Sequence, residues 1–385
     1  MIAYNRQSLD NRDIRQQAKE ALAAGIITTS EYDRIKAAYP VTFYSPNVFV
    51  RGGLFLLSVL AVACGLGLFM LMALGAGDHA FGFILVIWGL ACYGGLEFFI
   101  RVRGFYRAGV DDALLWLAGG LLFGGIFVLS HSLSPVLASG IVLILAAWGV
   151  LRYADRLMAV VAYGAFISLI FYFFIGHVSF GVMTLPFIIM AVSIILYLLF
   201  TNVSGKASSR HYHVCLSLLR MAALLGFYLS GNYYVVRNVG ASIHGDGASV
   251  ALGWLWWSFT VLVPLAYIVR GIQKKDAILL WTGLVLVAGA VFTVRYYYHV
   301  LPTELAMIAA GSILIVGAYG LIRYLRVSKY GFTSAAPVEP HLLEGLPVEG
   351  LIVAETFQSV VAAPVDRSNG FGGGSGGGGG ASGTY

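Results

Sequence analysis

The sequence predicts an all-α membrane protein, built as a polytopic bundle of about ten transmembrane helices. Hydrophobic residues make up 59% of its 385 positions and charged residues only 11%, whereas soluble domains carry about 25% charged residues. Apolar runs of about 18 residues or more, long enough to cross a bilayer, recur along the chain. Lys and Arg gather in every second connection between these runs, as expected of a chain that crosses a membrane many times.

Three regions of different composition divide the chain. Residues 1–48 are mostly polar, residues 49–330 contain the apolar runs, and residues 331–385 are rich first in Pro, Glu and Val and then in Gly. We therefore expect a helical hairpin, a ten-span transmembrane domain and a disordered tail.

Residues 1–48 are predicted to form two short helices. The stretch DNRDIRQQAKEALAAG contains helix-forming residues and ends at Gly25, a residue type that commonly terminates helices. Thr28 and Glu31 have the spacing of a capping box, which predicts the start of the second helix. Pro40 is expected to end it.

The run AKEALAAGIITTSEYDRIKAAY resembles the SHOCT-type short helical module. Multi-pass bacterial membrane proteins of unknown function often begin similarly, just before their first span. The resemblance implies an interaction or self-association role, and no catalytic residue transfers with it.

Ten spans are expected from the apolar runs, each about 20 residues long. The third and fourth runs are short. The main alternative to ten spans is therefore that these two runs form one span, or that one of them does not cross the membrane. The expected limits are 52–75, 80–100, 113–130, 134–151, 157–175, 180–201, 212–235, 248–269, 277–294 and 303–322.

Connections rich in Lys and Arg alternate along the chain with connections that hold few or none, as a count of ten spans requires. Arg101, Arg103 and Arg107 follow the second span, whereas the connections near Asp78 and His131 hold neither Lys nor Arg. Because positively charged loops stay in the cytoplasm, both termini are expected there. We therefore predict a multi-pass protein of the bacterial inner membrane, with a cytoplasmic N-terminus and a cytoplasmic C-terminus.

Two stretches of the sequence match each other. VRGFYRAGVDDALLW joins the second and third spans, and VRGIQKKDAILLW joins the eighth and ninth. These matches predict a duplicated four-helix unit, spans 1–4 and 7–10, with both copies running the same way through the membrane. Chance similarity between Leu- and Gly-rich helices is the alternative. Asp112 and Asp276 align at the starts of the third and ninth spans, where a carboxylate caps free N–H groups and favours the helix dipole.

Arg220 is the most unusual charged residue inside a span. It lies in HVCLSLLRMAALLGFYL, where an ionised group is costly unless it is paired or hydrated. Glu97, at a similar depth in the second span, is the expected partner, and the two form a candidate intramembrane polar site. A structural ion pair or an arginine that reaches the inner surface is the alternative. Glu97 is equally able to pair with Arg101, one turn further on.

No metal or cofactor is predicted. His79, His131, His177, His244 and His299 are expected on the outer side, but no single loop has metal-ligand spacing. No nucleotide-binding or hydrolase motif occurs in a supporting context, so an enzyme is less expected than a binding protein. The net charge of +6 follows the spans and does not indicate nucleic-acid binding.

The tail ends in GFGGGSGGGGGASGTY. Glycine buries almost no side chain, so the entropy lost on ordering is not recovered and the tail should stay disordered. Phe371 and the terminal Tyr385 make it similar to the glycine-rich tails of bacterial membrane-anchored TPM-domain proteins, although this chain lacks a TPM domain. The pattern suggests a flexible tether whose aromatic residues bind a partner, and an inert spacer is the alternative.

Two functions are compatible with these features. The first is a non-enzymatic scaffold or assembly factor that binds protein partners, or itself, through residues 1–48 and 331–385. The second is a transporter or lipid flippase, with a path between the duplicated halves lined by Arg220 and Glu97. The first is favoured because transporters usually show more intramembrane polar residues and broken helices.

Overall fold

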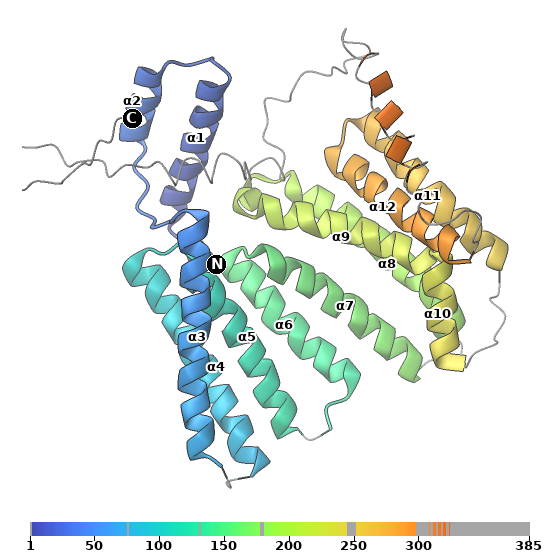
Figure 1. The fold of residues 1–385 in the computed structure, drawn as a ribbon, viewed down its shortest axis with the longest axis horizontal. Helices are drawn as coiled ribbons and strands as arrows, with labels where there is room; N and C mark the ends of the chain where they lie inside the picture. Colours follow the sequence, from blue (N-terminus) through green and yellow to red (C-terminus); the bar gives the residue numbers. More distant parts are fainter. Residues whose placement is uncertain are drawn as a thin grey trace, which may run out of the picture. The chain divides into compact units, whose positions relative to one another are not determined.

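A computed structural model describes residues 2–74, 77–130, 132–177, 181–244 and 252–297, together with eight isolated helical positions between 308 and 323. The chain divides into two units, Met1–Tyr319 and Gly320–Tyr385, and all the helices named below belong to the first. The described residues form helices joined by short connections (Figure 1). The all-α fold class predicted from the sequence is confirmed.

Two short helices form the N-terminal hairpin, and a 3-10 helix and a further short helix interrupt the later part of the chain. Nine other helices in the described residues are long and apolar enough to cross a membrane. The short elements are α1 (Arg6–Ala23), α2 (Thr29–Ala38), η1 (Ala207–Tyr212) and α10 (Tyr233–His244). The long helices are α3 (Val48–Met72), α4 (Asp78–Arg103), α5 (Val110–Leu129), α6 (Pro135–Tyr153), α7 (Arg156–His177), α8 (Gly181–Ser204), α9 (His213–Gly231), α11 (Gly253–Lys274) and α12 (Ala277–Tyr297).

The first nine expected spans correspond to the nine long helices. The third and fourth, which were among the shortest, are two separate helices, α5 and α6. The tenth, 303–322, lies mostly outside the described residues. The sequence pattern of long apolar runs was therefore sufficient to locate each described span.

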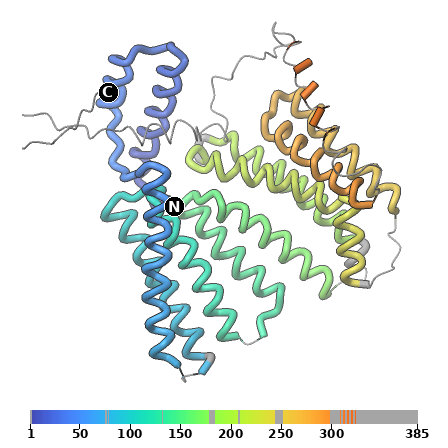
Figure 2. The backbone as a smooth tube through the Cα atoms, viewed as in Figure 1, coloured from blue at the N-terminus to red at the C-terminus, as the bar shows by residue number. Residues whose placement is uncertain are grey.

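Helices that follow one another in the chain pack as antiparallel pairs. These pairs are α4 with α5, α6 with α7, α8 with α9, and α11 with α12 (Figure 2). α3 packs mainly against α5, and α7 packs against α9. α9 also packs against α11 and α12, so it has neighbours on several sides, whereas among the described helices α3 packs chiefly against α4 and α5.

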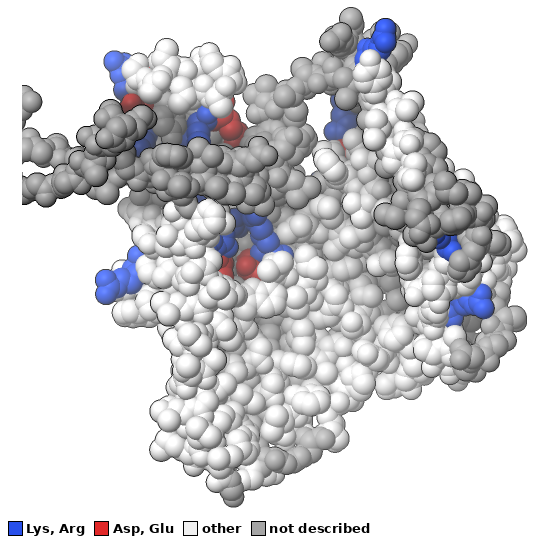
Figure 3. Space-filling view, viewed as in Figure 1, with Lys and Arg blue, Asp and Glu red and all other residues white. Residues whose placement is uncertain are grey.

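Lys and Arg are concentrated at one end of the bundle, which we call the basic end. It is the end at which α4, α6, α8 and α11 finish and α3, α5, α7, α9 and α12 begin. In Figure 3 blue side chains lie in the upper half of the view and at its right edge, whereas the lower part shows neither blue nor red. Of the described basic residues in the spans and α10, only Arg237 and Arg295 belong to the opposite end.

The N-terminal hairpin has the caps that the sequence predicted. Gly25 adopts a positive φ of 70° after α1, where an L side chain would be strained. Thr28 and Glu31 form the complete capping box of α2. The Thr28 backbone N–H donates a hydrogen bond to the Glu31 carboxylate, and this bond lowers the pKa of Glu31 from its ordinary value. α1 begins earlier than expected, because the Asn5 side chain accepts hydrogen bonds from the first turn.

The first part of the hairpin belongs to the main hydrophobic core. Leu96 of α4, Ala118 of α5 and Ala146 of α6 are all buried in this core. Tyr4 and Leu9 from the hairpin are buried in the same cluster. The removal of this apolar surface from solvent fixes the start of α1 on the basic end.

The structure corrects the end of the seventh expected span. α9 ends at Gly231, and Asn232 turns into an extended conformation, with ψ 130°, before α10. The buried Asn232 side chain donates to Tyr228 Oη at 2.9 Å and to Thr293 Oγ1 at 3.1 Å. These bonds satisfy polar groups that would otherwise be costly to bury at a helix break.

Candidate functional site

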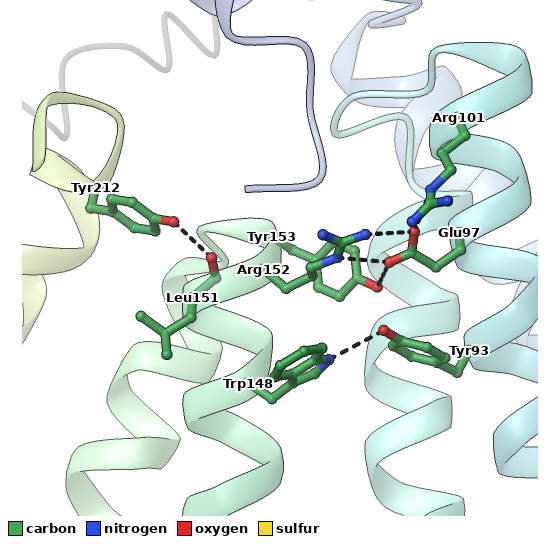
Figure 4. A network of polar contacts seen from close by, with 8 residues as sticks. All are labelled: Tyr93, Glu97, Arg101, Trp148, Leu151, Arg152, Tyr153 and Tyr212. Atoms are coloured by element: carbon green, nitrogen blue, oxygen red, sulfur yellow. Dashed lines mark hydrogen bonds and ion pairs between the residues drawn. The ribbon is translucent and has the colours of Figure 1, made fainter. Parts of the chain in front are cut away.

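Ion-paired side chains gather at the basic end, and Glu97 of α4 lies in the densest group (Figure 4). Arg152 of α6 donates two hydrogen bonds to this carboxylate, from Nε to Oε1 at 2.9 Å and from Nη2 to Oε2 at 3.0 Å. Arg101 approaches Oε2 at 2.8 Å, and the Tyr153 hydroxyl donates to Oε1 at 2.8 Å. The alternative that Glu97 pairs with Arg101 is the one that the structure shows, and Arg152 and Tyr153 are partners that the sequence did not reveal.

Aromatic side chains and a backbone contact extend this group to neighbouring elements. The Trp148 indole N–H donates to Tyr93 Oη at 3.3 Å, one turn further into the bundle (Figure 4). The Tyr212 hydroxyl of η1 donates to the carbonyl of Leu151 at 2.7 Å. The first of these bonds joins α4 to α6, and the second joins α6 to η1.

The Glu97 carboxylate has no acceptor position left for a substrate. Four hydrogen bonds reach its two oxygens, three of them from the charged groups of Arg101 and Arg152. A carboxylate held in this way stays ionised, because each bond favours the charged form. The geometry is that of a structural clamp between α4 and α6.

The expected pair between Arg220 and Glu97 is not formed. The Arg220 guanidinium instead donates to Asp276 Oδ2 at 2.7 Å, directly before α12, while Glu97 is occupied by Arg152. Arg220 and Asp276 are 15% and 22% exposed, so the pair is mostly buried. The prediction was wrong because it matched depth along two spans, whereas packing places α9 beside α12.

Arg220 reaches toward the basic end and does not lie alone in the hydrocarbon. Its guanidinium carbon is 5.7 Å from the centre of the Tyr197 ring of α8, an additional favourable contact for a cation. Its buried Nε has no hydrogen-bond partner among the described residues. This nitrogen is the one unsatisfied feature of an otherwise closed ion pair.

The two aspartates aligned by the internal match have different local roles. Asp276 Oδ1 accepts from Ile278 N at 3.0 Å and caps α12 as expected. At the start of α5 no side chain caps the helix, and the buried carboxylate of Asp111 instead accepts from the backbone N–H groups of Arg107, Ala108 and Gly109, which precede it. Asp112, expected to be the cap, instead binds Arg51 of α3.

The contact between Arg51 and Asp112 repeats that between Arg220 and Asp276. Arg51 NH2 lies 2.7 Å from Asp112 Oδ2, and its Nε lies 3.0 Å from the same oxygen. In each case an arginine of the first helix of the aligned unit meets the aspartate at the start of the third helix. The arrangement joins α3 to α5 and α9 to α12.

No family model matches this chain, and neither does any curated protein or solved structure. The site is therefore interpreted from its own geometry. Phe371 and Tyr385, the tail residues expected to bind a partner, lie outside the described residues.

Polar contacts fix the N-terminal hairpin on the basic end. Asp10 of α1 accepts from Arg210 of η1 at 2.6 Å. Arg12 donates to the Tyr106 hydroxyl at 3.0 Å, and its guanidinium carbon lies 4.7 Å from the centre of that ring. Ser8 shares a hydrogen bond of 2.8 Å with Thr42. The bond between Ser8 and Thr42 lies within residues 1–48, so the two anchors to the bundle are Asp10 and Arg12. Both belong to the first half of α1, and the rest of the hairpin projects away from them.

Tyr4 supplies a pH-dependent part of this docking. Burial raises the pKa of the Tyr4 hydroxyl well above its usual value, and the nearby carboxylate of Asp111 raises it further. In the undocked hairpin Tyr4 would titrate near pH 10, roughly its ordinary pKa. The docked state therefore holds more protons above that pH, and its stability falls as the pH rises.

Phenylalanine has no hydroxyl that can ionise. We therefore expect the hairpin of Tyr4→Phe to stay docked on the basic end at a higher pH than that of the wild type. The distance between spin labels at Ser30 and Arg103 reports docking, because both positions are exposed on the two sides of the contact. Above about pH 10, the wild-type distance distribution should broaden at a lower pH than that of Tyr4→Phe. Identical pH profiles would show that Tyr4 ionisation does not control docking.

Proposed function

We propose that the chain is an inner-membrane scaffold that binds a cytoplasmic protein partner through its N-terminal hairpin. The observation that carries this proposal is the asymmetry of the hairpin. The first half of α1 is anchored through Asp10 and Arg12, whereas α2 contains no buried residue. Ile26, in the turn between the two helices, is 71% exposed, so an apolar residue projects at the tip of a fixed support. An anchored surface of this kind loses little entropy when a partner binds.

The orientation that we propose follows from the distribution of charge. Loops rich in Lys and Arg remain in the cytoplasm, and most described basic residues of the spans belong to the basic end. The hairpin is attached to this end, so it would face the cytoplasm of a bacterium. The SHOCT-like pattern of residues 1–48 agrees with an interaction role for the same segment.

The transporter alternative loses the residues on which it depended. Arg220 and Glu97 belong to separate ion pairs, and each binds a partner at the basic end. Within the part of the chain that the structure describes, these two residues do not contact each other, so a common path lined by both has no support there. A structural role for both residues supports the scaffold.

We also propose that the chain contains two copies of one helical unit, which begin with α3 and α9. The repeated arginine–aspartate contact supports this proposal, because Arg51 and Arg220 occupy the same helix of each copy. The packing order supports it as well: the third helix packs against both the first and the second in each copy. Parallel repeats of this kind are related by an axis along the membrane normal.

Site-specific photo-crosslinking tests the scaffold. A photoreactive residue at Ile26 should form an adduct of discrete mass with a protein partner in native membranes. The matched control is Leu74, which is 68% exposed in a short connection at the opposite end of α3. Ile26→Ser should abolish co-purification of that same partner, whereas Leu74→Ser should not.

Removal of residues 331–385 distinguishes partner binding by the hairpin from partner binding by the tail. Retention of the partner after truncation would support the hairpin as the binding surface. Loss of the partner on truncation, with Ile26→Ser harmless, would contradict the proposal and assign binding to the tail. Equal adducts at both probe positions would also contradict it.

A further inference from the structure

Three arginines from different elements lie near one another at the basic end, and we call them the arginine cluster. Arg51 belongs to the first turn of α3, Arg107 to the loop before α5, and Arg156 is the first residue of α7. Arg156 interacts electrostatically with both Arg107 and Arg51. Because like charges repel, this arrangement destabilises the folded chain unless an anion offsets it.

Two of the three guanidinium groups have no carboxylate partner in the part of the chain that the structure describes. The ion pairs there include Arg51 but neither Arg107 nor Arg156. The Arg107 guanidinium carbon lies 5.5 Å from the centre of the Tyr106 ring, a contact that uses none of its N–H groups. Arg51 binds Asp112 through Nε and Nη2 and so keeps its Nη1 for another acceptor. The cluster therefore offers N–H donors from all three arginines.

The carboxylates closest to the cluster already have other roles. Asp112 accepts both hydrogen bonds from Arg51. Asp155 attracts Arg107 from a distance, and no hydrogen bond or ion pair joins the two among the described residues. Its Oδ1 instead accepts from Met158 N at 2.8 Å and caps α7. The excess positive charge of the cluster is thus left for a ligand.

The loop that carries Arg107 is fixed in place against α3. Arg107 has a positive φ of 51°, which an L side chain rarely adopts. The buried Asp111 carboxylate maintains this conformation, because it accepts from Arg107 N at 2.7 Å and from Gly109 N at 3.1 Å. A Cβ on Gly109 would clash with the carbonyl oxygen of Arg51, so the loop lies directly on α3. Two arms of the cluster are therefore positioned in advance, which lowers the entropy lost on binding.

We propose that the arginine cluster binds a phosphate group, carried by an anionic phospholipid of the inner leaflet. Guanidinium groups match phosphate oxygens in charge and in hydrogen-bond geometry. All three arginines lie in or directly before the first turn of a span, at the level of the headgroups, and basic sites between spans on the cytoplasmic side bind such headgroups. The choice of leaflet rests on the orientation proposed above. The site itself does not depend on the hairpin partner, so Ile26→Ser should bind the lipid as the wild type does.

Retention of lipid measures the affinity of the site. Native mass spectrometry of the full chain, released from nanodiscs of phosphatidylglycerol and phosphatidylcholine, should show one phosphatidylglycerol retained by the wild type. Arg107→Gln and Arg156→Gln should each weaken retention about fivefold, the effect of one basic residue near an anionic surface. Arg103→Gln is the matched control, because Arg103 is an exposed arginine of the same end outside the cluster. An equal loss in Arg103→Gln would overturn the proposal.

Thermal unfolding distinguishes lost binding from a damaged fold. In detergent without phospholipid, Arg107→Gln removes one of the repelling charges and should unfold at or above the Tm of the wild type. Added phosphatidylglycerol should raise the Tm of the wild type more than that of the variant, because a ligand stabilises the state that it binds. The same rise in both proteins would contradict a phosphate site at Arg107.

Inorganic phosphate distinguishes the two sources of the phosphate group. The lipid source predicts little binding of inorganic phosphate to the wild type in phosphatidylcholine nanodiscs. Tight binding of inorganic phosphate that is lost in the double variant Arg107→Gln with Arg156→Gln, without retention of phosphatidylglycerol, would support the site and reject the lipid. Retention that appears only after removal of residues 331–385 would overturn the proposal, because the acidic residues of that segment would then be the occupant.

Discussion

Replacement of Glu97 by glutamine is expected to lower the free energy of unfolding by about 3–5 kcal/mol, as found when one partner of a buried ion pair is removed. Glutamine keeps the shape of the side chain, so the change isolates the charge. Arg152 is only 21% exposed and would lose both bonds to a carboxylate. The buried Tyr153 hydroxyl would lose its charged acceptor. Since proteins are stable by roughly 5–15 kcal/mol, this single change should remove much of the margin.

Unfolding in mixed micelles with increasing SDS measures the effect of Glu97→Gln. The double variant Glu97→Gln with Arg152→Gln should recover part of the loss, because it no longer leaves a buried arginine without its counter-charge. Arg101 is 65% exposed and can turn to solvent in both variants. Glu20→Gln, at a half-buried position of α1 where Glu20 accepts from Gln16 and a glutamine oxygen could still accept, is the control and should have little effect. Equal stabilities of Glu97→Gln and wild type would refute the clamp.

Replacement of Arg220 by glutamine is expected to cost about 3 kcal/mol, because it leaves the mostly buried Asp276 carboxylate without its cation. The contact between α9 and α12 should loosen first, since this pair joins them. Hydrogen exchange at the start of α12 should therefore rise more than that at the start of α5. The global cost is measured by the same SDS titration.

Arg51→Gln is the internal control for Arg220→Gln. It removes the similar ion pair between Arg51 and Asp112, but Arg51 is 42% exposed, against 15% for Arg220. Exposed pairs contribute at most about 1 kcal/mol, because water screens both charges. A loss for Arg51→Gln as large as that for Arg220→Gln would show that burial does not set the strength of these pairs.

The spans and the hairpin caps could be predicted because their signals are local. Long apolar runs identify helices that can cross a bilayer whatever their neighbours are. The capping box of Thr28 and Glu31 depends on four successive residues, and it is present. The ion pair of Glu97 with Arg101 likewise needs only the spacing of one helical turn.

The remaining contacts depend on which helices are neighbours in space. Arg220 pairs with Asp276 because α9 packs against α12, and similarity of depth in the membrane does not reveal that neighbour. Asp111 and Asp112 are adjacent acids in the first turn of α5, and only the folded structure reveals that Asp111 binds the backbone of the preceding loop while Asp112 binds Arg51. The break at Asn232 had a local signal, since asparagine favours helix starts, but the apolar residues around it masked the signal.

Sidedness labelling tests most directly whether the basic end, with its ion pairs and hairpin, is the cytoplasmic side of a membrane protein. Single cysteines replace Ser30 of α2 and Ser242 of α10, which are exposed at opposite ends, in the Cys64→Ala background. In intact cells an impermeant maleimide should label Ser242→Cys and leave Ser30→Cys unmodified. Inside-out vesicles should give the reverse. Labelling of Ser30→Cys from outside intact cells, or of both positions from one side, would contradict this account.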